Sequence, residues 1–418
     1  MLRKLVSCPY LLWLTLCLLP GAAFAGIAAS SSADVKPNHK SGAAVPMSSA
    51  ASSSGFAVLH AFAGPPKDGG DAFAPLIQDA AGNLYGTTNR GGALGAGTVF
   101  KVDAKGRETV LYSFTGGTDG GHPNGAVARD ASGNLYGTTY DGGDTSCSPP
   151  TGCGTVFKLN AAHVLTVLHN FESGSDAASP LGGVILDSSG NLYGIGNGGN
   201  SFGYGTVYKV NIRTKVETVL HQFAGGSDGE YPEFESLLLD SSGNLYGTTQ
   251  MGGSSNLGTV FKVSRSRQET VLHSFAGGTS DGCYPFGGVT MDASGNLFGT
   301  TQQCGSSGFG TVWKLNSAES VLYSFAGGDK GANTYAGVVP DASGNLYGVT
   351  YQGGATGFGT VFKLTAGGEQ TVLHNFSRYK DGGLPWGGVL LGQHNRLYGT
   401  TKIGSRKSNG TLWSYGLK

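Results

Sequence analysis

Three aromatic residues spaced about 50 positions apart are the side chains best suited to contact a ligand. Phe286 and Trp386 each follow a proline, and Tyr335 follows a threonine in the same local context. Tyr231 and Tyr284 each precede a proline at a matching place. Aromatic rings fit the apolar faces of sugars, and Tyr and Trp add a hydrogen-bonding tip. We therefore interpret these five residues as candidate ligand contacts; the alternative is that they pack between structural units.

An aspartate recurs in the segment that precedes each of these places. The full set is Asp68, Asp119, Asp176, Asp228, Asp281, Asp329 and Asp381. The last three accompany the aromatic candidates, and we include them in the candidate binding site. A ring of carboxylates would bind cations or sugar hydroxyls. The alternative is that each aspartate shapes a turn by accepting hydrogen bonds from backbone N–H groups.

Histidine also recurs, but its pattern argues against one metal centre. His60, His169, His221, His273 and His374 occupy one repeat position, which Tyr112 and Tyr323 occupy elsewhere. Tyrosine is a poor replacement for a metal-binding histidine. We interpret these residues as packing groups with a polar tip, and we expect neither a metal nor a cofactor.

Catalytic signatures are absent from the sequence: there is no GxSxG, no HExxH and no phosphate-binding GxxxxGK. A metal-dependent hydrolase would need several carboxylates or histidines that converge. The residues available for that alternative are His122, Asn124, Glu233 and Glu235. We therefore expect a protein that binds rather than an enzyme.

Composition limits the class of protein. Of 418 residues 74 are glycine, yet aromatic residues make up 10 % and charged residues only 13 %. Disordered chains have few aromatics and many charges, so the glycines indicate a folded protein rich in turns. Lys+Arg and Asp+Glu balance at 27 each. A neutral chain lacks the basic surface that nucleic-acid binding requires.

The candidate residues are positioned by a repeat of about 50 residues. A motif like "SGNLYGTT" (132–139) recurs, with its asparagine at Asn83, Asn134, Asn191, Asn244, Asn296, Asn345 and Asn395. One unit reads "FESLLLD", "NLYGTT", "GTVFKV" and "ETVLHSF", four short β-strands that we name a to d. Seven such units predict an all-β, seven-bladed β-propeller of four-stranded antiparallel blades. An open solenoid would need polar capping repeats, and none is present.

The ends of the repeat region predict how the ring closes. The segment "FAVLHAF" (56–62) matches strand d, whereas the final "GTLWSY" (410–415) matches strand c. The last unit therefore lacks its own strand d, and the N-terminal strand completes it. Pairing of the two removes exposed sheet edges.

The unit "GNLYGTT…GTVFKL…ETVLHSF" resembles the GloVer-type tandem repeat of bacterial exported proteins, named for Gloeobacter and Verrucomicrobia. The resemblance extends from Phe56 to the C-terminus and implies no established activity. Three places depart from it: "NLYGIG" (191–196), "NRLYGTT" (395–401) and an enlarged loop with Cys147 and Cys153. Many members of the family carry a C-terminal surface anchor, which we do not expect after Lys418.

The N-terminus indicates export. Arg3 and Lys4 precede the apolar run "LLWLTLCLL" (11–19) and the small residues "AFA" (23–25). We expect a signal peptide over 1–25 with cleavage after Ala25, a disordered Ser/Ala-rich linker over 26–55 and the propeller over 56–418. The protein is then secreted, periplasmic or held at the cell surface. No later stretch is apolar enough to span a membrane, and we expect a monomer.

In a propeller the d–a and b–c loops share one face, and these loops vary most between units. On that basis Cys283 in a d–a loop is expected to pair with Cys304 in the b–c loop of the same blade. Cys147 and Cys153 close a small loop. We predict a binding module whose favoured ligand is a glycan or cell-wall polymer on this face. The alternatives are a propeller-type hydrolase or lyase and a structural surface repeat protein.

Overall fold

The computed structural model describes residues 55–418 except 173, 175, 200–201, 233–235 and 405–407. The expected signal peptide and nearly all of the expected linker lie outside the described residues. Short 3₁₀ turns are the only helices of the described part: η1 (Gly226–Asp228), η2 (Gly328–Lys330) and η3 (Gln393–Asn395). No helix in this part is long and apolar enough to cross a membrane.

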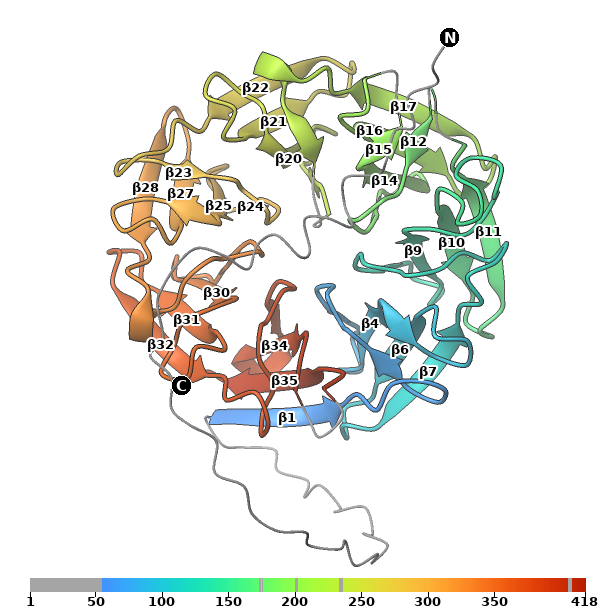
Figure 1. Ribbon diagram of the computed structural model, residues 1–418, viewed down its shortest axis with the longest axis horizontal. Helices are drawn as coiled ribbons and strands as arrows, with labels where there is room; N and C mark the ends of the chain where they lie inside the picture. Colours follow the sequence, from blue (N-terminus) through green and yellow to red (C-terminus); the bar gives the residue numbers. More distant parts are fainter. Residues whose placement is uncertain (1–54, 173, 175, 200–201, 233–235, 405–407) are drawn as a thin grey trace, which may run out of the picture. The chain divides into compact units, whose positions relative to one another are not determined.

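Seven four-stranded antiparallel blades form a closed ring, as the repeat predicted (Figure 1). In each blade strand d lies at the rim and the short strand a lies innermost. In the order a to d, the strands are β3 (Ile77–Gln78), β4 (Leu84–Thr88), β6 (Thr98–Val102) and β7 (Glu108–Ser113) in blade 1; β8 (Ala128–Arg129), β9 (Leu135–Thr139), β10 (Thr155–Leu159) and β11 (Leu165–Asn170) in blade 2; β13 (Ile185–Leu186), β14 (Asn191–Gly196), β16 (Thr206–Asn211) and β17 (Glu217–Gln222) in blade 3; β19 (Leu238–Leu239), β20 (Leu245–Met251), β21 (Thr259–Val263) and β22 (Glu269–Ser274) in blade 4; β24 (Thr290–Met291), β25 (Leu297–Thr301), β27 (Thr311–Leu315) and β28 (Glu319–Ser324) in blade 5; β29 (Val339–Pro340), β30 (Leu346–Thr350), β31 (Thr360–Leu364) and β32 (Gln370–Asn375) in blade 6; β33 (Leu390–Gly392), β34 (Arg396–Thr401), β35 (Thr411–Gly416) and β1 (Gly55–Ala61) in blade 7.

The ring closes through the N-terminal strand. β1 pairs antiparallel with β35, from Gly55 opposite Gly416 to Ala61 opposite Thr411. Phe62 follows at once, is fully buried and meets Phe100 of blade 1 with ring centroids 5.3 Å apart. The first strand of the fold therefore completes the last blade and also anchors the first, so the predicted split blade is confirmed.

The recurring motif builds the a–b turn through one aspartate. In blade 4, Asp240 Oδ1 accepts hydrogen bonds from the backbone N–H groups of Ser242 and Asn244. Its Oδ2 accepts from Asn244 Nδ2 and from the hydroxyl of Tyr246. Gly243 alone supplies the left-handed conformation here, with φ of 83°. Asn244 has no positive φ and acts through its side-chain amide.

The glycine inside "NLYGTT" makes room for a large ring from strand c. A Cβ on Gly247 would lie 2.7 Å from Phe261 Cζ, and one on Gly299 would lie 2.3 Å from Trp313 Cζ2. Such contacts are too short for any side chain, so the ring can pack only over glycine. The same approach occurs in all seven blades, at Gly86, Gly137, Gly194, Gly247, Gly299, Gly348 and Gly399.

The two threonines of the motif connect strands and blades. In blades 1, 2, 4 and 5 the first bonds to the backbone of the next blade, as when Thr87 Oγ1 donates to Gly125 O at 2.9 Å. The second pairs with the first threonine of strand c, as in Thr88 and Thr98, whose hydroxyl oxygens lie 2.7 Å apart. Blade 3 departs from the motif and has Gly196 instead, which leaves the buried hydroxyl of Thr206 without a partner. The motif is therefore a structural unit, and its repetition needs no shared chemistry.

Deletion of Phe56–Phe62 is expected to destabilise the ring severely. The deletion removes the strand that covers β35 and a fully buried phenylalanine, whose loss alone costs ~3–5 kcal/mol. Thermal melting and size-exclusion chromatography check this. Removal of 48–54 is the matched control and should leave both unchanged. A monomer of unaltered melting temperature after the first deletion would contradict the closure.

Replacement of Asp240 by alanine is expected to lower the free energy of unfolding by ~1–3 kcal/mol, because two backbone and two side-chain donors lose their acceptor. Although burial raises the pKa of Asp240, the bonds from Asn244 outweigh it and lower that pKa. A lowered pKa stabilises the fold above the unfolded value, and this contribution is lost as pH falls through the folded value. Denaturant unfolding should thus show a wild-type advantage at pH 7 that shrinks in acid.

The control for this turn is Asp144→Ala, since the Asp144 carboxylate is fully exposed and accepts only from Ser146. It should unfold like wild type at both pH values. Equal losses in the two variants would show that the turn carboxylate has no special role.

Candidate functional site

The d–a and b–c loops of every blade pair with each other on one face of the ring, as expected. Four pairs form short ladders, of β2 (Gly69–Gly70) with β5 (Arg90–Gly91), β12 (Ala177–Ala178) with β15 (Gly198–Gly199), β18 (Glu230–Pro232) with β20, and β23 (Gly282–Cys283) with β26 (Gln303–Cys304). The other three blades use single bridges, Gly121 with Asp141, Ala332 with Gln352 and Gly383 with Ile403. This pairing gives the ring one face made of paired, variable loops.

One residue of each d–a loop holds a left-handed backbone conformation. The seven residues have φ between 48° and 57°: Asp71, His122, Ser179, Tyr231, Tyr284, Asn333 and Leu384. For a non-glycine residue this conformation costs ~1–2 kcal/mol. Each N–H donates to a carbonyl of the preceding blade's b–c loop, as Tyr284 N does to Leu257 O at 2.8 Å. The strained residue thus joins neighbouring blades and fixes the direction of the chain as it enters strand a.

Two positions of each blade lie beside this strained residue and vary in chemical type. One lies two residues after it, and the other directly follows strand b's "GTT". We call both sets the mouth residues. The first set is Phe73, Asn124, Leu181, Phe286, Tyr335 and Trp386, with Glu233 outside the described residues; the second is Asn89, Tyr140, Asn197, Gln250, Gln302, Tyr351 and Lys402.

Five mouth residues from neighbouring blades form a continuous aromatic arc: Phe73, Phe286, Tyr335, Tyr351 and Trp386. Trp386 stacks on Tyr335 with ring centroids 4.4 Å apart and meets Tyr351 edge-on at 5.4 Å. Phe286 approaches Tyr335 at 5.0 Å, and Phe73 approaches Trp386 at 5.8 Å. The structure therefore brings Phe286, Tyr335 and Trp386 together, and it adds two rings that sequence reasoning missed. Phe73 was detectable, because "DAFAP" aligns with the other loops once Ala72 takes the place of the proline.

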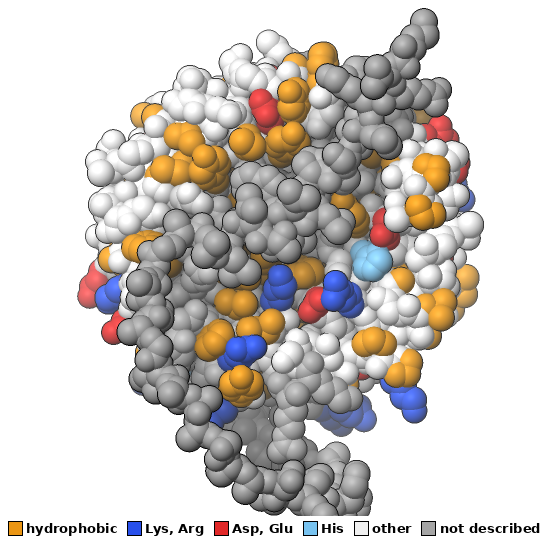
Figure 2. Space-filling view, viewed as in Figure 1, with side chains coloured by type: hydrophobic (Ala, Val, Ile, Leu, Met, Phe, Trp, Pro, Cys, Tyr) orange, Lys and Arg blue, Asp and Glu red, His pale blue; other side chains and the backbone are white. Residues whose placement is uncertain are grey.

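Basic and acidic side chains lie beside hydrophobic ones near the centre of the face seen in Figure 2. Lys402 Nζ lies 5.2 Å from the Trp386 ring centroid and 5.5 Å from that of Phe73. Burial lowers the pKa of Lys402, while the charge of Asp71 opposes this. Burial likewise raises the pKa of Asp71, whose carboxylate lies 3.6 Å from Arg90 Nε. A partly desolvated ammonium group on aromatic rings can donate strong hydrogen bonds to a ligand.

Polar side chains occupy the mouth on the other side of Phe73. Asn89 Nδ2 donates to Asn124 Oδ1 at 2.7 Å across the boundary of blades 1 and 2. His122 Nδ1 lies 2.9 Å from Asp141 Oδ2. Glu233 and Glu235 lie outside the described residues. The described mouth thus changes from aromatic to hydrogen-bonding around the ring.

The loop aspartates of the candidate site face the rim instead. Asp281 Oδ2 lies 3.3 Å from His273 on an outermost strand and accepts from Ala276 N, and Asp381 binds His374 and Ser377 N in the same way. Asp329 lines a separate cavity at the rim. The turn-shaping interpretation of these aspartates fits their contacts, whereas the acidic ring at the mouth does not form.

Tyr231 and Tyr284 of the candidate set are two of the strained residues. Tyr231 meets Tyr204 of the preceding blade edge-on, with ring centroids 5.9 Å apart. Both side chains are partly buried. They border the mouth residues along the chain but contribute no ring to the aromatic arc as defined here.

Both disulfides have the expected pairing, Cys147–Cys153 and Cys283–Cys304. The second joins β23 to β26, that is, a d–a loop to the b–c loop of the same blade. Blade 5 carries Phe286 and Gln302 on these segments, so the disulfide fixes the backbone beneath one end of the aromatic arc.

A family model of the Gloeobacter/Verrucomicrobia repeat matches residues 21–238 and 233–418. The chain therefore belongs to this family of repeat proteins. No curated protein matches it.

One solved structure shares the fold at low sequence identity. An extracellular domain assigned to a one-component system of B. thetaiotaomicron is 10 % identical with a TM-score of 0.54, over 86 % of this chain and 39 % of that one. A protein of unknown function from Bacteroides thetaiotaomicron is 14 % identical with a TM-score of 0.45, over 88 % of this chain and 76 % of that one. The chain thus spans about two fifths of the first of these proteins.

Removal of the Cys283–Cys304 disulfide by a double serine substitution is expected to cost ~3 kcal/mol of stability, because the bond closes a 21-residue separation. The Cys147–Cys153 disulfide joins residues only six positions apart, so its removal by the same substitutions should cost less stability. Denaturant unfolding of both variants checks the order. A larger loss for the shorter loop would contradict the role of the longer one as the support of blade 5.

Proposed function

We propose that the protein is an exported binding module that holds a glycan or cell-wall polymer at the mouth residues. The observation that carries this proposal is the contrast between positions. The residues that build each blade repeat from blade to blade, whereas the mouth residues differ in nearly every blade and still contact one another. Variation on a rigid scaffold is typical of a recognition surface.

The chemistry of the mouth suits a polyhydroxylated ligand with apolar ring faces. Four rings of the aromatic arc are partly buried and Phe286 is buried, and Lys402 and Asn89 offer N–H donors beside them. Such a mixture of aromatic surface and a few polar groups is common in sugar-binding sites. Lys402 is the best placed donor, because its ammonium group lies over two rings at once.

Trp386 has a different role from the one that its residue type suggests. Its ring is surrounded by Tyr335, Tyr351, Phe73 and the Lys402 ammonium group. The indole therefore supports the arc, and a ligand would meet Lys402 and the remaining ring edges first.

Export agrees with the two disulfides, which form and persist in oxidising compartments. The similar domain from B. thetaiotaomicron is described as extracellular, which supports the same location. We propose that the protein is a monomer that works in the periplasm, at the cell surface or in the medium.

A propeller-type hydrolase is the second candidate, and one observation favours it. His122 and Asp141 form a hydrogen-bonded pair beside the mouth, and the His122 side chain is 37 % exposed. A carboxylate-oriented imidazole can act as a general base. Turnover of a bound glycan that His122→Asn abolishes would establish this candidate over simple binding.

A glycan array is expected to identify a ligand of the mature chain, and Lys402→Met should then weaken its binding about tenfold or more. The substitution keeps the aliphatic stem on the rings and removes one charged donor, worth ~1.5–3 kcal/mol. Titration calorimetry measures the affinity and thermal melting measures stability. Melting should be unchanged in this variant.

Trp386→Ala and Tyr335→Phe serve as the comparison for this prediction. The first should lower stability by ~3–5 kcal/mol along with binding. The second removes only the hydroxyl that Gln302 contacts and should leave stability nearly intact. Full affinity in Lys402→Met, or an array without any ligand, would refute the proposed site.

A further inference from the structure

Four clusters of one histidine, one aspartate and one glutamate lie at boundaries between blades. In each cluster the three ligand-type atoms lie within 4.8 Å of one another. The clusters are His60–Asp68–Glu108, His169–Asp176–Glu217, His221–Asp228–Glu269 and His273–Asp281–Glu319. They lie at the rim and share no residue with the mouth.

Each cluster is assembled from two blades in the same way. The histidine comes from strand d of one blade, the aspartate from the crossover that follows, and the glutamate from the start of strand d in the next blade. His60 Nε2 lies 3.0 Å from Asp68 Oδ2, and the corresponding distances in the other clusters are 3.1, 3.0 and 3.3 Å. The histidine and aspartate side chains are at most 21 % exposed.

The glutamate of each cluster has an unsatisfied oxygen. Oε1 is fully buried and lacks a hydrogen-bond partner in Glu108, Glu217, Glu269 and Glu319 alike. A buried polar atom without a partner costs ~1–3 kcal/mol, and more when it is charged. The same feature occurs at Gln370, so it belongs to this position of the repeat, but only the four glutamate oxygens lie close to both a histidine and an aspartate with which they could share a ligand.

The remaining boundaries show what replaces the cluster. Tyr112 donates to Asp119 between blades 1 and 2, where Leu165 stands in the glutamate position. Between blades 6 and 7, the ring of Phe56 stacks on His374 with centroids 3.6 Å apart. Glutamate therefore occurs only where histidine faces it.

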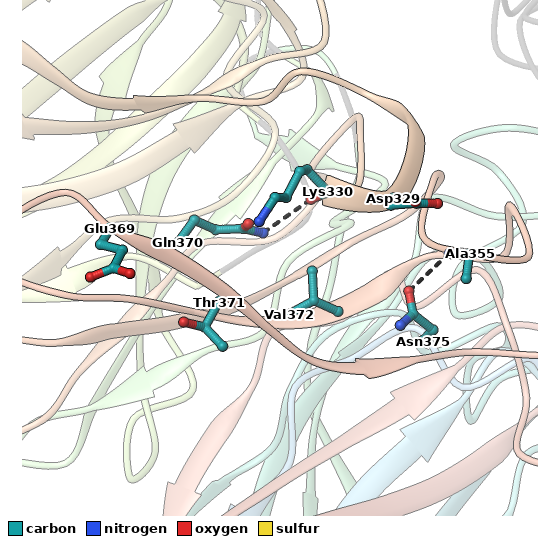
Figure 3. A pocket seen from close by; sticks show the side chains of 8 residues that line it. All are labelled: Asp329, Lys330, Ala355, Glu369, Gln370, Thr371, Val372 and Asn375. Atoms are coloured by element: carbon teal, nitrogen blue, oxygen red, sulfur yellow. Dashed lines mark hydrogen bonds between the residues drawn. The ribbon is translucent and has the colours of Figure 1, made fainter.

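The boundary of blades 5 and 6 gives the clearest contrast (Figure 3). Tyr323 replaces the histidine there, and Gln370 replaces the glutamate. Gln370 Nε2 donates to the backbone oxygen of Lys330 at 3.0 Å, and Asp329 lines a cavity of about 550 Å³. The Gln370 amide nitrogen thus donates to the protein backbone, which a carboxylate cannot do, while Gln370 Oε1 is buried without a partner as in the four glutamates.

We propose that each His–Asp–Glu cluster binds one divalent transition-metal ion, so that four ions connect neighbouring blades. Imidazole nitrogens and carboxylate oxygens are both ligands of zinc, with bond lengths of ~2.0–2.2 Å. Two ligand atoms on one such ion lie about 3 Å apart, as the histidine and aspartate atoms do. Calcium fits poorly, because it takes six to eight oxygen ligands.

Metal binding requires deprotonated ligands, so the affinity of each cluster depends on pH. The ion displaces any proton on the glutamate, which passes to solvent, while the neutral histidine binds through Nε2 and carries its proton on Nδ1. Binding should therefore be stronger at pH 8 than at pH 6.

Native mass spectrometry and titration calorimetry of the tag-free mature chain with Zn²⁺ test the proposal. At pH 8 we expect four ions per chain and a rise in melting temperature. Each of Glu108→Gln, Glu217→Gln, Glu269→Gln and Glu319→Gln should remove one ion. Because Gln370 occupies this position in the native chain, these variants are expected to fold.

The quadruple glutamine variant separates the clusters from other binding. It should bind none of the four ions, and Zn²⁺ should not raise its melting temperature. His122→Asn is the matched control, since His122 belongs to a histidine–aspartate pair outside the clusters; it should retain four ions. Unchanged stoichiometry in the quadruple variant, or no saturable binding by the wild type, would overturn the proposal.

Discussion

The pairing of β1 with β35 is the interaction on which the other features of this molecule depend. A chain of repeats has two ends, and without this pairing blade 7 would expose the edge of its third strand. Closure also brings blade 1 beside blade 7, so that Phe73 meets Trp386 and Lys402. His60 lies on β1 itself, and its cluster with Asp68 and Glu108 exists only because that strand is held at the rim.

Each blade contains positions with two different roles. The glycine under the large ring occurs in all seven blades, and the turn aspartate and the paired threonines each occur in six, so these positions solve one packing problem with residue types that hardly change. The mouth residues have no shared packing task and range from Phe and Trp to Asn and Lys. The rim follows a third pattern, because a boundary has either the His–Asp–Glu cluster or a substitute such as Phe56 on His374. The proposed recognition site therefore lies at the mouth of the ring, whereas the side chains that join blades through these clusters lie at the rim.

The sequence predicted the fold well because one motif is repeated seven times. Its spacing gives the period, each copy shows the same four strands, and the unmatched strand at the N-terminus predicts the closure. Cys283 and Cys304 could be paired because the strand order places their loops on one face. The role of Asn244 could not be predicted, since only coordinates distinguish a side-chain hydrogen bond from an unusual φ. The same limit applies to Trp386, whose surroundings depend on how neighbouring blades meet.

The rim clusters were missed for a different reason. Within one repeat, the glutamate of "ETVLHSF" precedes the histidine by four residues, which suggests that the two belong together. In the ring each glutamate faces the histidine of the preceding blade instead, so the pairs that matter, such as His60 and Glu108, are about 50 residues apart. A search for ligands that converge on a single ion therefore finds none of them.

The central claim is that the face of paired d–a and b–c loops recognises the ligand. Hydrogen–deuterium exchange with and without a glycan selected on an array tests it most directly. The account predicts slower exchange in 332–336, 351–352, 383–386 and 402–403, and no change in the a–b turns of the opposite face. Protection confined to those turns, or to the outer strands, would contradict it.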